Sequence, residues 1–290
     1  MAQTPAPKTI LVVDDDPDIH DLLRALAASP DWRIDDAYSG AEALSRLESA
    51  SYDLVLTDVR MPGGIDGLEL ARRIQELRPG SKVVVMTAES TPVTLIQSLR
   101  DGAFSYFSKP FDGSAVLEMI NQALETTGGS DDIEVLSARP QWIAVNVRCV
   151  PGIADRLVQF LRELKMDLPA HDRENVAQAL REILMNAIEH GGHFDPNQRV
   201  YLAYVRTSRM ILYHLRDPGK GFSFNDLPHA AVSNPPGSPT GHVEYRLERG
   251  LRPGGFGILL VRELVDELIY SEKGNEVLLM KYLPEPGATG

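Results

Sequence analysis

Acidic side chains and one lysine follow successive short apolar segments in the first half of the chain. Asp14 and Asp15 come directly after KTILVV, Asp58 follows DLVLT, Thr87 follows KVVVM, and Lys109 lies just past FSYF. If these segments are parallel strands, their carboxyl ends share one edge of a sheet, where such folds carry their chemistry. One Asp there could simply cap a helix, but the whole set favours a site. Clustered carboxylates suit Mg²⁺, a carboxylate such as Asp58 can accept a phosphoryl group, and Lys109 can neutralise the charge that develops.

A second group of polar side chains lies on one predicted helix in the second half of the chain. The segment REILMNAIEHGG places Glu182, Asn186 and His190 at intervals of four residues, so they form a polar stripe beside an apolar face. An Asn offers a neutral oxygen to Mg²⁺ beside phosphates. A solvated helix face is the other interpretation of this stripe.

Two glycine-containing segments follow this helix. RDPGKGF places Asp217 after a predicted strand, where an Asp in a dry pocket can accept a hydrogen bond from an adenine amino group. PGGFGILL precedes a predicted helix, where backbone N–H groups can approach an anion. The glycines of the two segments are Gly219, Gly221, Gly254, Gly255 and Gly257. Each segment alone is more often a turn, but their order and spacing favour a nucleotide site. No GxxxxGKS/T occurs, so it is not a P-loop.

The elements that must position the first group alternate along residues 9–125. Apolar, β-branched segments typical of parallel strands buried on both faces lie at 8–13, 53–57, 82–86 and 104–107. A more polar segment at 33–38 is expected nearer an edge. Helical stripes such as Ile19, Leu22, Leu23 and Leu26 lie between the strands. Five strands alternating with five helices predict a doubly wound α/β domain.

The second half has a different pattern. TTGGSDDI is small and polar, and we expect a linker over 126–139 between a domain at 9–125, preceded by a tail at 1–8, and a domain at 140–285. The second domain is predicted to hold strands, helices and a hairpin in the order 141–147, 153–164, 172–190, 199–206, 209–216, 257–269 and 275–283. This is an α+β layout with helices on one face of a mostly antiparallel sheet.

Composition narrows the class of protein. The chain has 290 residues, of which 43% are hydrophobic and 24% charged, so two ordinary globular domains are expected. A formal net charge of −12 disfavours nucleic acid as a partner. Cys149 is the single cysteine, which excludes an intrachain disulfide and favours a reducing compartment. No membrane span or signal peptide is recognisable in the sequence. The expectation is therefore a cytoplasmic protein without a membrane partner.

Residues 9–125 resemble the receiver domain of bacterial two-component response regulators, a flavodoxin-like fold. The resemblance implies that Asp58 is the phosphoacceptor, that Asp14 and Asp15 hold Mg²⁺ with it, and that Thr87 binds the phosphoryl group. It also implies a salt bridge from Lys109, a cis bond before Pro110, and a Tyr106 that turns inward as Thr87 moves. One departure is the loop MPGGIDG, which carries one residue more than the common MPxMDG form.

Residues 140–285 resemble a GHKL-type ATPase domain with the Bergerat fold, shared by gyrase, histidine kinases and anti-sigma factor serine kinases. The last group is the most similar, on the E-x-x-x-N-A-x-x-H helix, the GF ending of RDPGKGF and the compact length. The resemblance implies ATP as ligand, with 223–253 as a flexible lid. The implied roles are general base for Glu182, Mg²⁺ ligand for Asn186, nucleotide binding for His190, adenine contacts for Asp217, Gly219 and Gly221, and phosphate contacts for Gly254, Gly255 and Gly257.

These resemblances together imply a response regulator whose output is an ATP-dependent protein serine/threonine kinase in a partner-switching pathway. Its expected partners are a sensor histidine kinase as phosphodonor, a STAS-type anti-sigma factor antagonist as substrate, a sigma factor or other target, and a second copy of the chain. Three alternatives are an ATP-binding module that transfers no phosphate, a sensor histidine kinase and a transcription factor. The pairs His20-Asp21 and His171-Asp172 lie inside the two domains, which disfavours a histidine kinase, and no helix-turn-helix segment follows the receiver.

Overall fold

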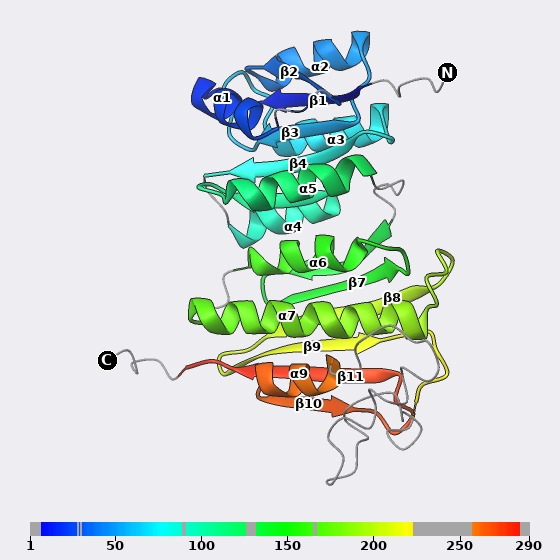
Figure 1. Cartoon of the computed structure of the whole chain (residues 1–290). Coiled ribbons are helices and arrows are strands. Elements are labelled where there is room, and N and C mark those ends of the chain that lie inside the picture. Colours follow the sequence, from blue (N-terminus) through cyan, green and yellow to red (C-terminus); the bar gives the residue numbers. More distant parts are fainter. Residues whose placement is uncertain are drawn as a thin grey trace. The chain divides into compact units, whose positions relative to one another are not determined.

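The computed structural model describes residues 7–27, 29, 31–88, 91–125, 132–164, 167–222 and 257–284. The chain divides into two compact units, Met1–Ile133 and Glu134–Gly290, and each unit has its own sheet (Figure 1). Within these described ranges, no helix is both long enough and apolar enough to cross a membrane.

The N-terminal unit is a five-stranded parallel sheet in the order β2-β1-β3-β4-β5, which confirms the predicted flavodoxin-like fold. The polar strand β2 lies at one edge, as expected. The strands are β1 (Lys8–Val13), β2 (Trp32–Ala37), β3 (Leu54–Asp58), β4 (Lys82–Thr87) and β5 (Ser105–Ser108). The helices are α1 (Pro17–Leu26), α2 (Gly40–Ser49), α3 (Gly67–Leu77), α4 (Pro92–Arg100) and α5 (Gly113–Glu125).

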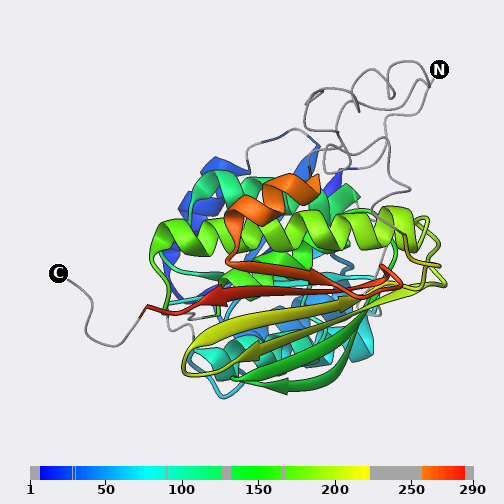
Figure 2. The same ribbon diagram turned by 90° about the horizontal axis from the view of Figure 1, so that it is seen from below.

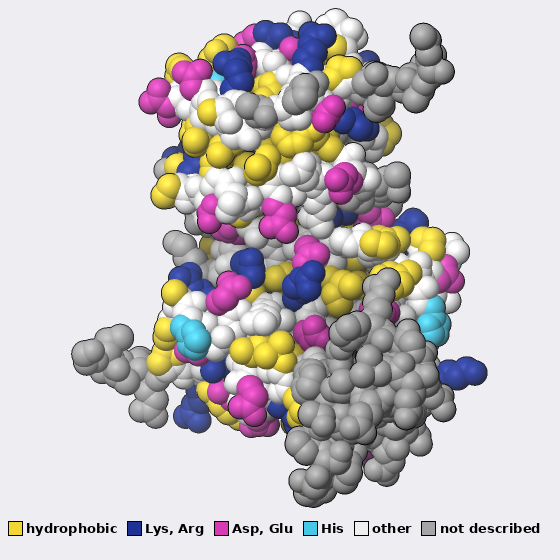
Figure 3. Space-filling view, viewed as in Figure 1, with side chains coloured by type: hydrophobic (Ala, Val, Ile, Leu, Met, Phe, Trp, Pro, Cys, Tyr) yellow, Lys and Arg dark blue, Asp and Glu magenta, His cyan; other side chains and the backbone are white. Residues whose placement is uncertain are grey.

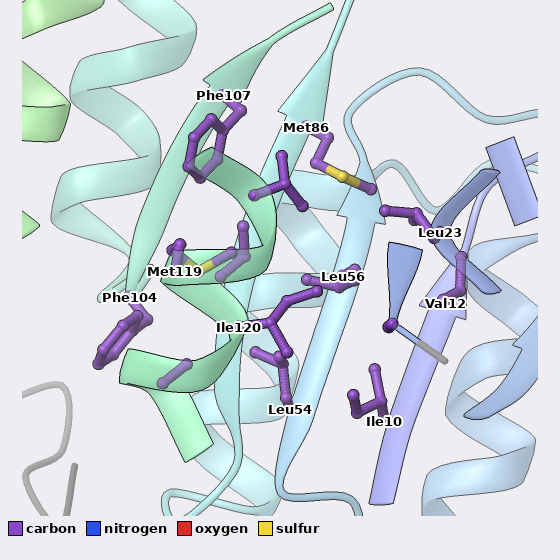
Figure 4. Close-up of a cluster of buried hydrophobic side chains, with 14 residues drawn as sticks. Ile10, Val12, Leu23, Leu54, Leu56, Met86, Phe104, Phe107, Met119 and Ile120 are labelled. Atoms are coloured by element: carbon purple, nitrogen blue, oxygen red, sulfur yellow. The ribbon is translucent and has the colours of Figure 1, made fainter. Parts of the chain in front are cut away.

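Apolar layers cover both faces of this sheet. One layer joins Ile10, Leu54 and Leu56 to Leu23 of α1 and Ile120 of α5 (Figure 4). The other layer joins the neighbouring strand residues to α2 and α3. Successive side chains of a strand point to opposite faces, so a strand covered on both sides must be apolar throughout. Polar side chains are therefore left to the strand ends.

The C-terminal unit is a six-stranded sheet in the order β10-β11-β9-β8-β7-β6. The helices described for this unit lie on one face, with α7 between α6 and α9 (Figures 1 and 2). The strands are β6 (Ile133–Arg139), β7 (Trp142–Arg148), β8 (Arg199–Arg206), β9 (Met210–Arg216), β10 (Glu267–Tyr270) and β11 (Glu276–Tyr282). The helices are α6 (Ile153–Arg162), α7 (Ala170–Asn186), the π-helical turn η2 (Ala187–Gly191) and α9 (Gly257–Leu264). The predicted α+β sandwich, consistent with a GHKL ATPase, is confirmed.

Two predicted boundaries are wrong. The linker expected over 126–139 extends too far, because residues 133–139 form β6 and pair with β7 at the sheet edge. The helix expected near 257–269 ends at Leu264, because residues 267–270 form β10 and pair with β11. In both places the pattern of apolar residues does not distinguish a strand from the predicted linker or helix. The segment becomes a strand because it can pair with a neighbouring strand of the sheet.

Candidate functional site

Three carboxylates meet at the carboxyl edge of the N-terminal sheet. Asp14 follows β1 and Asp58 ends β3, and both are buried, whereas Asp15 is exposed. The carboxylate oxygens of the three residues lie within 4.8 Å of one another. This oxygen-only donor set, with one member open to water, fits Mg²⁺, which keeps several waters in protein sites. The grouping expected from the sequence is therefore present in the structure.

Lys109 supplies a counter-charge to this cluster. Its Nζ lies 2.6 Å from Oδ2 of Asp14 and 3.2 Å from Oδ2 of Asp58. Burial disfavours the charged ammonium, but the two carboxylates outweigh it and raise the pKa of Lys109. The Lys109–Pro110 peptide bond is cis, as expected. Lys109 therefore remains a cation at neutral pH, between the two buried carboxylates.

Asp58 is held in a partly dry environment. Burial raises the pKa of its carboxyl, Lys109 opposes that shift, and Asp14 adds to it. The backbone N–H of Val59 donates a 2.7 Å hydrogen bond to Oδ1 of Asp58. The other oxygen, Oδ2, is the one that faces Lys109. The side chain is thus oriented from both sides at the point where it meets the other carboxylates.

Thr87 and Tyr106 lie on the neighbouring strands β4 and β5. Thr87 ends β4 and is buried, and its backbone carbonyl accepts a 2.7 Å hydrogen bond from the N–H of Lys109. Tyr106 lies in β5 and is fully buried, with its hydroxyl 3.1 Å from Oγ1 of Thr94 on α4. The tyrosine is therefore directed into the unit and links β5 to α4.

Sequence reasoning missed His20, which supports this site from α1. It is 1% exposed, and its Nδ1 lies 2.9 Å from Oδ1 of Asp36 while its Nε2 lies 2.8 Å from the carbonyl oxygen of Asp14. The ring therefore ties β2 to the end of β1 that carries Asp14. His20 is buried on α1 together with Leu23, but its residue type and spacing do not indicate these contacts.

In the C-terminal unit, Glu182 and Asn186 lie one turn apart on α7, with Asn186 Nδ2 3.5 Å from Oε1 of Glu182. The first residue of α9, Gly257, packs directly on this carboxylate, because a Cβ built there would lie 1.9 Å from Oε1. His190 falls in η2 and is exposed, and the described residues give it no hydrogen bond or ion pair. The structure therefore joins Glu182 and Asn186 to α9 but leaves His190 outside the group.

Asp217 is held at the end of β9 by the loop that the sequence singled out. Gly219 N–H donates a 2.7 Å hydrogen bond to its Oδ1, and burial raises the pKa of the Asp217 carboxyl. Gly221 has a left-handed backbone, φ 80°, and a Cβ there would meet the carbonyl oxygen of Lys273 at 1.8 Å. Only glycine fits that position, where the loop passes the β10–β11 turn.

Sequence reasoning missed two glycines that bring η2 onto this loop. A Cβ at Gly191 would lie 2.5 Å from Cβ, Cγ and Oδ1 of Asp217, and a Cβ at Gly192 would lie 2.1 Å from Sγ of Cys149. A π-helical turn is uncommon and is frequent at functional sites. The HGG that ends the helix was the available sequence signal. The end of the helix thus contacts the Asp217 carboxylate directly.

Tyr270 and Asn275 complete this region and were also missed. Burial raises the pKa of Tyr270, and the negative charges of Asp217 and Glu182 add to the shift. Its ring packs edge-on against Phe222 at 5.3 Å between centroids. Asp217 N–H donates to the carbonyl oxygen of Asn275 at 3.0 Å. The predicted Gly254, Gly255 and lid 223–253 lie outside the described residues.

Both halves of the chain match known families. Residues 10–121 match the response regulator receiver domain family, and residues 144–281 match the histidine kinase-like ATPase domain family. These two matches agree with the two sheets and with the two groups of side chains described above.

Individual relatives match one part of the chain. The chain is 36% identical over 126 residues to the transcriptional regulatory protein GlrR of Escherichia coli (strain K12), an alignment that covers 43% of this chain and 28% of GlrR. It is 38% identical over 118 residues to the transcriptional regulatory protein ZraR of Salmonella typhimurium, covering 41% of this chain and 26% of ZraR. The chain thus spans little more than a quarter of the length of these curated relatives.

Among solved structures, a CheY-like response regulator receiver domain protein from Methanospirillum hungatei JF-1 is 31% identical. That match covers 41% of this chain and 95% of the other, with a TM-score of 0.40. From the two family matches and the two sheets, the chain is a response regulator receiver domain fused to a histidine kinase-like ATPase domain.

Proposed function

We propose that this protein is a response regulator, phosphorylated on Asp58, that controls an ATP-dependent protein serine/threonine kinase of the anti-sigma factor type. The observation that carries the kinase part is the contact between Glu182 on α7 and Gly257 at the first turn of α9. The N-terminus of a helix attracts phosphate groups. A carboxylate at that point, beside Asn186, is our candidate for the general base that accepts the proton of an incoming hydroxyl.

In the proposed receiver reaction, an oxygen of the Asp58 carboxylate attacks phosphorus and the bond from phosphorus to the donor's leaving atom breaks. Lys109 lies 3.2 Å from Asp58 and stabilises the negative charge on the transferring oxygens. Asp14, Asp15 and Asp58 would hold Mg²⁺, which supplies further charge neutralisation when bound. Thr87 at the end of β4 is our candidate to donate a hydrogen bond to the phosphoryl group.

In the proposed kinase reaction, a serine or threonine hydroxyl of a protein substrate attacks the γ-phosphorus of ATP and ADP leaves. Glu182 accepts the hydroxyl proton. Asp217 accepts a hydrogen bond from the adenine amino group, while Gly219 keeps the carboxylate oriented. Asn186 would ligate Mg²⁺ beside the phosphates. The role of Glu182 distinguishes a kinase from a domain that only binds ATP, because binding alone needs no base.

The proposed partners follow from this pair of reactions. A sensor histidine kinase would supply the phosphoryl group to Asp58, and a STAS-type antagonist protein would receive one from the kinase domain. A sigma factor or another target would be bound or released as the antagonist changes state. Phosphorylation of the receiver would change kinase activity or partner affinity, a coupling typically worth about 1–3 kcal/mol.

The kinase assignment is tested with labelled ATP, Mg²⁺ and a panel of STAS proteins. We expect Glu182→Gln to bind ATP normally in calorimetry but to lose phosphate transfer by about 10²–10⁴-fold. The matched control is Glu189→Gln, which removes an exposed acid just beyond the same helix. Transfer at the wild-type rate by Glu182→Gln contradicts the assignment of the base. No nucleotide binding by the wild-type protein contradicts the ATP site.

The receiver assignment is tested with acetyl phosphate. Asp58→Asn should abolish aspartyl labelling, whereas Asp21→Asn, at an acid 82% exposed on α1, should leave it unchanged. Kinase activity and partner affinity are then compared with and without beryllofluoride in the wild type and in Asp58→Asn. A change in kinase activity or partner affinity on adding beryllofluoride to the wild type, but not to Asp58→Asn, supports coupling. Equal activity and affinity in both proteins, with and without beryllofluoride, show that the two units act independently.

A further inference from the structure

One face of the C-terminal sheet is not covered by the helices that the structure describes, α6, α7 and α9. The side chains of Val145, Leu202 and Tyr213 are buried, and the strand register places them on one face of the sheet, the face that we assign to the helices. Their strand neighbours alternate to the opposite face, which carries Trp142, Asn146 and Arg148 of β7 and their register partners on β8 and β9. Trp142 is 54% exposed and Arg148 is partly exposed, so this open face reaches solvent at both ends of β7.

Two arginines lie directly opposite each other on this open face. Arg148 of β7 is the register partner of Arg199 of β8, so their side chains project from the same face. Directly opposed residues of antiparallel strands have Cβ atoms about 4.5–5.5 Å apart, and like charges in such a pair are destabilising. Arg216 on β9 pairs with Tyr201, one register row away, which adds a third guanidinium to the same end of the face.

The charge of the opposed pair is not compensated within the described parts of the chain. Arg148 and Arg199 form no ion pair or side-chain hydrogen bond there, whereas Arg216 lies 3.7 Å from Glu276. Nε of Arg148 and Nη1 of Arg199 are buried atoms without a hydrogen-bond partner. Buried donors without an acceptor cost stability and call for an explanation.

The helical face of the same unit is different. There Arg162 pairs with Glu174 at 2.7 Å and Arg181 pairs with Asp155 at 2.5 Å. Figure 3 shows acidic and basic side chains interspersed over the helices of this unit. The chain has a net charge of −12, and the arginines on the helical face have acidic partners. Among the described residues, the opposed arginine pair has no acidic partner and therefore differs from them.

The residues that share the open face with Arg148 and Arg199 indicate what class of ligand would bind there. Toward the other end of the same face lie apolar side chains: Trp142 of β7 opposite Val205 of β8, which in turn lies opposite Leu212 of β9. A free anion would use the arginines alone. A protein segment carrying both acidic and apolar side chains would use the whole face. The net charge disfavours nucleic acid and anionic lipid surfaces.

We propose that the open face of the C-terminal sheet is a docking surface for an acidic segment of a partner protein. Carboxylates of that segment accept hydrogen bonds from Arg148 and Arg199, and its apolar side chains pack on Trp142 and Val205. The guanidinium group suits this task because its planar donors match a carboxylate. The surface lies on the opposite side of the sheet from Tyr270, Glu182 and Asp217, so the inference does not depend on the proposed kinase reaction.

The test measures binding of the full chain to a fluorescein-labelled peptide of repeated Glu-Glu-Leu triplets by fluorescence anisotropy. We expect saturable binding that weakens as salt is added. The variant Arg148→Gln/Arg199→Gln should weaken it by roughly tenfold or more, because truncation leaves the partner's charge unpaired. The matched control is Arg209→Gln, an exposed arginine in the β8–β9 turn, which should bind as the wild type does.

Additional measurements distinguish this docking surface from the nucleotide site, from a small-anion site and from a self-association interface. Asp217→Ala, which removes the proposed adenine acceptor, should retain peptide binding while losing ATP binding. Loss of ATP binding can therefore be told apart from loss of peptide docking. Equal binding of a Gln-Gln-Leu peptide overturns the charge argument. Full competition by inorganic phosphate overturns protein docking in favour of a small-anion site. Self-association that is lost in the double arginine variant, as seen by sedimentation, overturns the acidic partner in favour of a second copy.

Discussion

The contact between Gly191 and Asp217 allows a direct test of the proposed nucleotide site. An added methyl at Gly191 would lie 2.5 Å from Cβ of Asp217 as well as from its carboxyl group. Rotation of the carboxyl group alone cannot relieve a clash with Cβ, so either the loop or the end of η2 must move by about 1 Å, since ordinary carbon contacts are about 3.5–4.0 Å. We therefore expect Gly191→Ala to displace the Asp217 carboxylate.

The expected magnitude follows from the cost of overpacking. Forcing a methyl group into a packed site typically costs about 1–3 kcal/mol. Alanine also favours helical backbone over glycine by about 1 kcal/mol, which offsets part of the loss of stability. If the displacement removes the adenine contact, ATP affinity falls between about fivefold and a hundredfold, at about 1.4 kcal/mol for each factor of ten. The free energy of unfolding should therefore change less than the free energy of ATP binding does.

The assay is calorimetric titration of ATP with Mg²⁺ into the wild type and two glycine variants, with thermal unfolding measured in parallel. Gly80→Ala is the control, because a Cβ at that turn meets nothing within 4 Å. Asp217→Ala provides the reference for complete loss of the adenine acceptor, because an Asn would still offer an amide oxygen. Wild-type affinity in Gly191→Ala, together with weak binding by Asp217→Ala, would refute the packing argument while leaving the proposed role of Asp217 intact.

Other substitutions and conditions test the same sites. Because burial raises the pKa of Asp217, ATP affinity should fall as pH is lowered toward that raised value, while the nucleotide-free protein gains stability over the same range. Calorimetry measures the change in affinity and urea unfolding measures the change in stability. Asp217→Asn, which does not titrate, should remove both pH effects. Gly192→Ala should lower the free energy of unfolding by about 1–3 kcal/mol, and adding Cys149→Ala should recover part of it in urea titrations, since Sγ is the nearest atom. The pKa of the Cys149 thiol is raised to about 11 by burial and nearby acids, so iodoacetamide should label it at neutral pH only after unfolding. Lys109→Met should destabilise the metal-free receiver by as much as about 3 kcal/mol, with added Mg²⁺ restoring part of the loss in thermal unfolding.

The receiver could be predicted from sequence almost in full, for a physical reason. Strands buried on both faces must be apolar throughout, so β1, β3 and β4 are distinct in the sequence. Their carboxyl ends meet at one edge by topology alone, which places Asp14, Asp58 and Lys109 together. His20 was missed because a polar residue on the buried stripe of a helix gives no sign of what it contacts.

The C-terminal unit was less predictable because its decisive contacts depend on tertiary structure. The segment ILLVRELVDELIY reads as one continuous amphipathic helix, yet the chain leaves it at Leu264 so that β10 can pair with β11. The regular spacing of Glu182, Asn186 and His190 assumed an uninterrupted α-helix, and η2 breaks that spacing beyond Asn186. Tyr270 joins the site through the pairing of an edge strand, which no local pattern indicates.

The strand β6 has a practical consequence for anyone who separates the two units. Placing the start of an isolated ATPase domain at residue 140 would delete β6 and leave the backbone hydrogen-bonding groups of β7 unpaired along a new sheet edge. That edge would begin with Trp142, which is already 54% exposed in the intact chain. An open edge beside an exposed aromatic side chain invites strand-to-strand aggregation. A fragment that starts before Asp132 keeps β6 and should be the soluble, monodisperse choice.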